Sequence, residues 1–203
     1  MHGKLHLDGV HHHEVETLKA RLASCVSDEI LNTNLAISMQ YYLFLLALDD
    51  RYSLPGPVVN SVYKDVILHI ASVVEGMLLY ALKELRKRGS LPDACLEREE
   101  IFSDVKEVYR IADAHAVVAG IRKRRPIPLK DDANFIVLNR IAKRSGLFDE
   151  GIFGDAESLR RTRNRIHLAS LQEKDGAYVR KDVEKAFSIM ESVLTRVEVA
   201  MEA

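Results

Sequence analysis

The sequence predicts an all-α protein, and three observations support this prediction. The chain of 203 residues contains only 10 glycines and 5 prolines and no tryptophan, so residues that favour helices dominate it. Apolar residues recur at three- and four-residue spacing in several long segments. No segment alternates with a period of two for long enough to indicate a sheet. We therefore expect a helical bundle in which two long antiparallel helices are accompanied by shorter ones.

Composition and charge narrow the class of protein. The net charge is −1, so nucleic-acid binding would have to come from local basic patches and not from a global positive field. Cys25 and Cys95 have no metal-ligand spacing, which favours a reduced, cytoplasmic setting. The most apolar runs are short or interrupted by His69 and Glu75, so we expect a soluble protein with no membrane span.

The chain begins with a segment that we expect to be a flexible arm, residues 1–13. It holds five of the eight histidines and two glycines. The run from His11 to His13 does not converge on one face of a helix or strand, so we expect no functional metal site there. Residues 14–203 are expected to form a single helical domain, beginning with a short amphipathic helix over residues 14–23.

Two long helices should follow. Ser27 is a suitable N-cap for a helix that extends through Asp49, and a Pro-Gly-Pro segment separates it from the next helix. Residues 58–88 are predicted to form one long helix closed by Gly89. Because its middle, residues 66–82, is apolar almost all round, we expect it to be the central helix of the fold.

Glu75 lies inside that apolar stretch. A buried carboxylate is costly unless a cation or several hydrogen-bond donors face it. Two interpretations stay open. Glu75 is either a paired core carboxylate that fixes packing, or it pairs with and orients an arginine of the arginine-rich segment at residues 159–168.

Residues 97–121 are predicted to form the next helix, because Ile101, Val105, Val108 and Ile111 follow helical spacing. Pro126 and Pro128 should end it after a basic loop. The basic residues of this loop are Arg122, Lys123, Arg124 and Arg125. They are either a solvated turn or a second nucleic-acid-binding patch.

Three further helices are expected in the C-terminal part. The first covers residues 131–144, and a loop over residues 147–154 follows it. Asp155 is then the predicted N-cap of an arginine-rich helix. After a polar turn at residues 172–176, a last helix should open at or just before Asp182 and continue to the end of the chain.

The arginine-rich helix carries the strongest functional signal. Four arginines fall within six positions and are followed by a histidine: Arg160, Arg161, Arg163, Arg165 and His167. On a helix, Arg160, Arg163, Asn164 and His167 share one stripe beside an apolar stripe. Glu157 can reach Arg160 and Arg161, but one carboxylate cannot neutralise four guanidinium groups, so a phosphate is the expected external partner.

This segment resembles the signature of the HEPN superfamily, which is all-α. The signature is an arginine followed after four to six residues by a histidine, often with a polar residue directly after the arginine. Arg161 has the required spacing to His167, whereas Arg163-Asn164 supplies the dipeptide but stands only three residues before His167. Which arginine is the family's arginine stays open. The setting of Glu75 in Val73-Val74-Glu75-Gly76-Met77-Leu78 is also similar to a buried glutamate on an earlier helix of the family.

The resemblance implies metal-independent RNA cleavage of toxin or defence type, without a cofactor. In that chemistry the RNA 2′-OH attacks the adjacent phosphate and leaves a 2′,3′-cyclic phosphate. The catalytic residues would be Arg161, Arg163, Asn164 and His167, supported by Glu75, with Arg160, Arg165 and the basic residues 122–125 binding RNA. His167 would transfer the proton and an arginine would hold the phosphate.

The resemblance also implies partners. They are RNA, a second copy in a homodimer and possible inhibition by a cognate antitoxin. A non-catalytic RNA-binding or protein-interaction scaffold is the alternative, since many similar domains do not cleave RNA.

Overall fold

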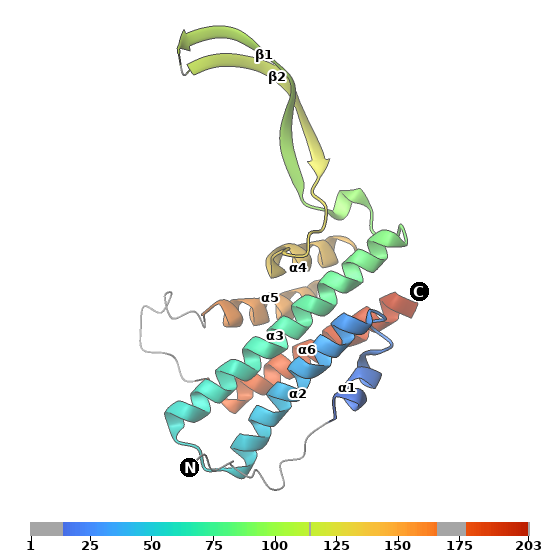
Figure 1. Cartoon of the computed structure of the whole chain (residues 1–203), viewed down its shortest axis with the longest axis vertical. Coiled ribbons are helices and arrows are strands. Elements are labelled where there is room, and N and C mark those ends of the chain that lie inside the picture. Colours follow the sequence, from blue (N-terminus) through green and yellow to red (C-terminus); the bar gives the residue numbers. More distant parts are fainter. Residues whose placement is uncertain (1–13, 114, 166–177, 203) are drawn as a thin grey trace.

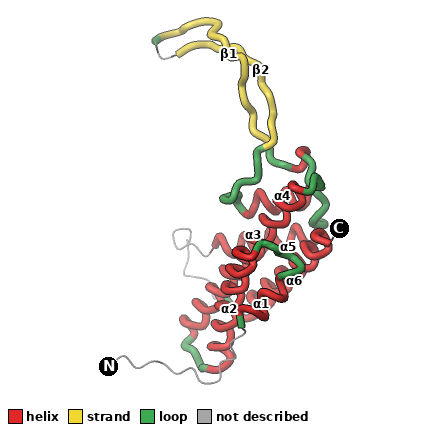
Figure 2. Tube along the Cα trace, turned by 45° about the vertical axis from the view of Figure 1, so that its right-hand side comes forward, coloured by secondary structure: helices red, strands yellow, loops and turns green. Residues whose placement is uncertain are grey.

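The computed structural model describes residues 14–113, 115–165 and 178–202. Within these ranges, helices form an elongated body and a long two-stranded ribbon projects from one end of it (Figure 1; Figure 2). The helices are α1 (Val15–Leu22), α2 (Glu29–Arg51), α3 (Gly56–Lys87), α4 (Phe135–Arg144), α5 (Glu150–Arg165) and α6 (Arg180–Glu202), with a short 3-10 turn, η1 (Asp93–Cys95). The strands are β1 (Arg98–Ala112) and β2 (His115–Pro126).

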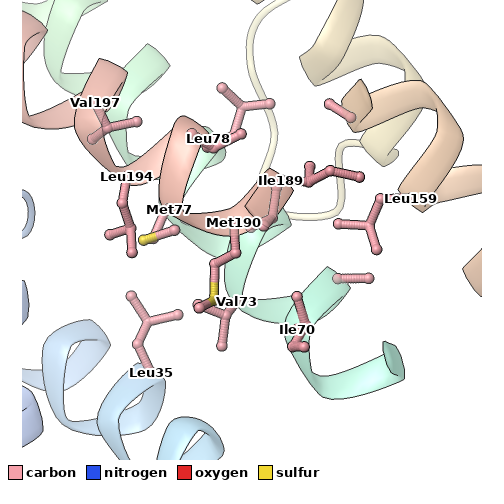
Figure 3. Packing of buried hydrophobic residues seen from close by; sticks show 14 of the residues in the cluster. Leu35, Ile70, Val73, Met77, Leu78, Leu159, Ile189, Met190, Leu194 and Val197 are labelled. Atoms are coloured by element: carbon pink, nitrogen blue, oxygen red, sulfur yellow. The ribbon is translucent and has the colours of Figure 1, made fainter. Parts of the chain in front are cut away.

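Helix α3 is the centre of the helical body, as the sequence predicted. It contacts α2, α4, α5 and α6, and a wide face of it is fully buried, including Ile67, Val73 and Leu78. Figure 3 shows Met77 and Val73 of α3 packed among Met190 and Leu194 of α6, with Leu35 of α2 on the other side. Burial of this apolar surface is the main stabilising contribution of the fold.

The helix ends follow ordinary capping chemistry. The Asp28 carboxylate caps α2 by accepting a 2.8 Å hydrogen bond from the backbone N–H of Leu31. Gly89 follows α3 with a φ of 77°, the left-handed conformation that closes many helices and that glycine adopts without steric cost. The two long helices that the sequence predicted correspond to α2 and α3.

The prediction of an all-α fold is wrong, because the segment expected to be a helix over residues 97–121 forms a β-hairpin. β1 and β2 pair antiparallel from Arg98 opposite Pro126 to Ala112 opposite His115. β-Branched and aromatic side chains are frequent in β1, and β2 adds Val117, Val118 and Ile121; such side chains favour extended backbone. Cross-strand ion pairs, such as Glu100 with Arg124, add to the pairing. The protein is mixed α/β, although most of it is helical.

Irregular pairing explains why the hairpin was missed. The register shifts three times, between Ser103 and Lys106, between Glu107 and Tyr109, and between Arg110 and Ala112. Each shift adds a residue on β1 and reverses the inside–outside alternation along that strand. Asp104 has a positive φ of 52° at the first shift. The apolar residues of β1 therefore lose their period of two and fall by coincidence at helical spacing.

The hairpin is joined to the helical body at its base. The backbone N–H of Ile127 donates a 2.8 Å hydrogen bond to the carbonyl of Glu97. The side chain of Glu97 also accepts a 3.1 Å hydrogen bond from Arg144 at the end of α4. Beyond this base the two strands extend away from the helices (Figure 2).

Two helix boundaries also differ from the prediction. α4 begins at Phe135 and not near residue 131. α5 begins at Glu150, five residues before the predicted N-cap Asp155, so most of the predicted loop is helical. The Asp149 carboxylate accepts a 2.9 Å hydrogen bond from the N–H of Ile152, and this bond together with Arg196 lowers the pKa of Asp149.

By length and composition, α2 and α3 are each apolar enough to cross a membrane. In the most apolar window, 33% of α2 and 56% of α3 is buried inside the protein. Because a core helix of a soluble protein meets the same criterion, these helices do not by themselves identify a membrane protein.

Candidate functional site

Helix α5 presents the arginine-rich segment from one side of the helical body. Its buried residues are Ala156 and Leu159, and it packs against α3, α4 and α6. Figure 3 shows Leu159 directed towards Ile70 and Ile189. The charged residues of the last two turns therefore emerge along the margins of this contact and on the outer face of α5.

Arg163 is anchored to the central helix. Its guanidinium lies 3.4 Å from the carboxylate of Glu75 on α3, and the two side chains are 32% and 24% exposed. The sequence interpretation in which Glu75 pairs with an arginine of this segment is thus observed. The pair is half-buried and not deep in the core, so each group keeps part of its hydration.

Glu157 holds the first two arginines of the cluster, as its spacing predicted. Arg160 donates two hydrogen bonds to its carboxylate, at 2.8 and 2.5 Å, and Arg161 donates one at 3.3 Å. The hydrogen bonds from Arg160 are the main cause that lowers the pKa of Glu157 to about 2. Glu157 is therefore ionised throughout the physiological range.

The two arginines differ in their freedom. The side chain of Arg160 is 17% exposed and is held by a bidentate interaction. The side chain of Arg161 is 68% exposed and shares an oxygen that Arg160 already uses. Arg161 can therefore leave Glu157 without uncovering an unpaired buried charge.

Of the remaining predicted residues of this segment, the structure describes Asn164 and Arg165 but not His167. Asn164 and Arg165 are exposed at the end of α5. Arg165 forms no ion pair with another described residue. His167 lies outside the described residues. The described part of the site is therefore the group of arginines with Glu75 and Glu157.

The second predicted basic patch does not join this cluster. Arg122, Lys123, Arg124 and Arg125 lie on β2, which projects away from α5 (Figure 1), and they do not form a loop. Arg122 and Arg124 pair with Glu100, and Arg125 pairs with Glu99. Glu99 and Glu100 on the neighbouring strand thus match two of the four positive charges of this patch, which weakens it as a site for phosphate.

Sequence reasoning missed a polar group beside α5. Lys185 of α6 donates a 3.2 Å hydrogen bond to the hydroxyl of Ser158, next to a small groove of about 80 Å³ that Thr162 and Asp182 also line. These two residues are 27 positions apart in the sequence, so no local spacing signals the contact. Among the described residues, no group of three or more His, Cys, Asp or Glu side chains could hold a metal ion.

No family model, curated protein or solved structure matches this chain.

Proposed function

We propose that the protein is a HEPN-like, metal-independent endoribonuclease of toxin or defence type. The observation that carries the proposal is the different state of two arginines on α5. Arg163 is 32% exposed and lies 3.4 Å from Glu75 on α3, whereas Arg161 is 68% exposed and shares the Glu157 carboxylate with Arg160. A partly covered guanidinium and an exposed one, both just before His167 in the sequence, support a role for this segment in binding phosphate.

This difference assigns roles to the two candidate arginines. Arg161, with five residues between it and His167, would bind the scissile phosphate and stabilise the charge that develops on it. Arg163 and Glu75 would hold the end of α5 on α3, so that the catalytic groups keep their positions. His167 would accept the proton of the attacking 2′-OH or donate one to the leaving 5′-oxygen. Asn164 and Arg165 would contact the neighbouring ribose and phosphate.

The proposal includes the partners that the resemblance implies. RNA is the substrate, two copies form a homodimer, a cognate antitoxin could act as an inhibitor, and the protein works in the cytoplasm. No cofactor takes part, because the proton transfers need only side chains.

A non-catalytic RNA-binding or protein-interaction scaffold is the second candidate. It is favoured by the fact that Arg160 and Arg163 are both engaged by the protein's own carboxylates. Two of the four arginines then serve the fold, and the remaining charge would suffice for binding without cleavage.

RNA cleavage in the presence of EDTA separates these candidates. Purified protein is incubated with labelled RNA, and the products are tested for 2′,3′-cyclic phosphate ends. We expect His167→Ala to abolish cleavage and Arg161→Ala to lower its rate by about 100-fold or more. Arg140→Ala, at an exposed arginine of α4, is the matched control and should leave the rate unchanged.

Two results would contradict catalysis at this site. Wild-type protein that binds RNA without cleaving it would favour the scaffold. Cleavage that persists in His167→Ala would place the activity elsewhere or in a contaminant.

A further inference from the structure

Helix α2 exposes apolar side chains on the side that faces away from the core. Ile30, Ile37 and Tyr41 are 76%, 49% and 42% exposed. Residues 30–48 of this helix include no charged residue, although a surface helix of a soluble protein normally carries charges on its outer face. A contiguous apolar surface of this kind usually marks an interaction site.

The outward residues of α2 repeat with the spacing of a coiled-coil seam. Six positions that alternate between intervals of four and three residues are here called the α2 seam: Ile30, Asn34, Ile37, Tyr41, Phe44 and Leu48. At about 100° per residue they fall within a sector of about 80°, on the opposite side of the helix from the buried Leu35, Met39 and Tyr42. A mean period of about 3.5 residues lets two helices pack along their length.

The neighbouring helices leave much of the seam accessible. α2 packs against α1 and α3, and its buried Tyr42 contacts Met190 of α6. Within the seam, the ring of Tyr41 lies 4.6 Å from that of His69 on α3 and still keeps the exposure given above. Phe44 and Leu48 are half-buried. The outer side of α2 is therefore an apolar part of the molecular surface.

We propose that the α2 seam packs against the α2 seam of a second copy of this chain, with the two helices antiparallel. A two-fold axis near Met39 then matches each seam residue with another one. The layers of the pair are Ile30 with Leu48, Asn34 with Phe44, and Ile37 with Tyr41. This inference assigns a surface to the homodimer of the proposed function, but it does not rest on RNA cleavage or on the residues of α5.

The charges at the two ends of α2 favour the antiparallel direction. Glu29 and Arg51 are exposed, lie at opposite ends of the helix and, at about 100° per residue, fall on the same flank of the seam. In the antiparallel pair, Arg51 of each copy lies beside Glu29 of the other, about 3 Å apart along the axis. A parallel pair would place Glu29 beside Glu29 and Arg51 beside Arg51, and these like charges repel each other.

A lipid surface suits the seam less well than a second helix. Helices that lie on membranes carry Lys and Arg beside the apolar face, where they attract anionic headgroups. The charged residues of α2 are Arg51 and the acidic Glu29, Asp49 and Asp50. Asn34 would be costly in hydrocarbon, whereas one polar position in a helix–helix seam fixes the register.

The area of the seam sets the expected strength of the dimer. At about 200 Å² for a full side chain, the three most exposed seam residues leave on the order of 300 Å² per copy. With the half-buried and marginal residues the total is on the order of 500 Å², below the roughly 800 Å² per partner of a standard interface. We therefore expect a weak dimer with a dissociation constant in the micromolar range.

Two exposed apolar residues provide a matched test. Ile37 lies in the seam, and Val199 of α6 is 56% exposed but lies outside it. Full-length wild type, Ile37→Lys and Val199→Lys are compared by sedimentation equilibrium from about 5 to about 500 µM. We expect the dissociation constant of the dimer to rise about 30-fold or more in Ile37→Lys and less than about threefold in Val199→Lys. The two variants have equal charge, and circular dichroism checks that both keep the helical body.

A charge exchange tests the direction of the helices. Arg51→Glu should weaken the dimer about fivefold, because it places two carboxylates together at each end of the pair. Adding Glu29→Arg to this variant restores opposite charges and should return the dissociation constant to within about twofold of the wild-type value. In a parallel pair, both variants would keep like charges side by side, and the second substitution would restore nothing.

Four results would overturn the proposal. A wild-type protein that is monomeric throughout this concentration range has no such interface. A dimer that is equally stable in Ile37→Lys and wild type is formed by another surface. A dimer that Ile37→Lys weakens but the charge exchange does not restore is not antiparallel. Flotation of wild-type protein with phosphatidylglycerol–phosphatidylcholine vesicles, lost in Ile37→Lys, would make lipid the occupant of the seam.

Discussion

At the scale of single residues, Glu157 makes stability depend on pH. Its pKa is about 2 in the folded protein and close to 4.5 when unfolded. Because the folded value is the lower one, its contribution is complete above about pH 4.5 and is lost as the pH falls towards 2. Solvent screening of this partly exposed pair limits the contribution to about 1 kcal/mol.

A comparison of wild type with Glu157→Gln checks this pH dependence. Urea unfolding followed by circular dichroism should show the variant less stable by about 1 kcal/mol at pH 7. The difference should shrink between pH 4.5 and 2. A difference that is the same at pH 7 and at about pH 2.5 would mean that ionisation of Glu157 does not stabilise the fold.

Glu75 offers a second residue-scale prediction, which depends on the proposed function. Glu75→Gln removes the charge that holds Arg163. We expect a stability loss below about 1 kcal/mol but a fall in RNA cleavage of about tenfold or more, because α5 loses its fixed position. Glu84→Gln is the control, since Glu84 lies on the same helix, pairs with Lys87 and has a nearly equal exposure of 25%. Equal cleavage by both variants would leave Glu75 with a packing role only.

At the scale of elements, two glycines should respond to alanine in opposite directions. Gly89 has a φ of 77° after α3, so Gly89→Ala should destabilise the protein by about 1 kcal/mol. Gly154 lies inside α5, and a Cβ there would meet nothing within 4 Å. Gly154→Ala should therefore stabilise the protein by about 0.5–1 kcal/mol. Thermal unfolding of both variants tests the contrast, and destabilisation by Gly154→Ala would show that α5 is not helical there.

The same scale shows what the sequence could predict. α2, α3 and α6 were predictable because their apolar residues follow helical spacing against a single core. The hairpin was not, because its register shifts erase the alternation of β1 and none of its apolar residues belongs to the buried core. The start of α5 differs from the predicted N-cap Asp155, because the Asp149 carboxylate accepts a hydrogen bond from the N–H of Ile152 and caps the helix earlier.

Predictability was similarly uneven for the candidate site. The interactions of Glu157 with Arg160 and Arg161 follow from spacing within one helix, so they could be predicted. The contact of Glu75 with α5 could be expected because a half-buried carboxylate needs a cation. The contacts of Arg163 with Glu75 and of Lys185 with Ser158 depend on how α3, α5 and α6 pack. The spacing of residues along the sequence does not predict this packing.

At the scale of the whole molecule, the helical body should fold without the hairpin. All the buried core residues lie outside the two strands. Arg98 and Pro126 are directly paired, so their Cα atoms are about 5 Å apart and a short glycine–serine link can replace residues 99–125. We expect the free energy of unfolding to change by less than about 1 kcal/mol in this variant. A loss of several kcal/mol in chemical denaturation would show that the strands support the core.

The long ribbon also governs how the molecule moves through solution. β2 alone, with 12 residues, extends about 40 Å, close to the length of about 48 Å expected for the 32 residues of α3. Such an outline raises the frictional ratio above that of a sphere of equal mass and gives the small-angle scattering profile an extended tail of long interatomic vectors. Gel filtration calibrated with spherical standards will therefore overestimate the mass, so only methods independent of shape can count the copies in a particle.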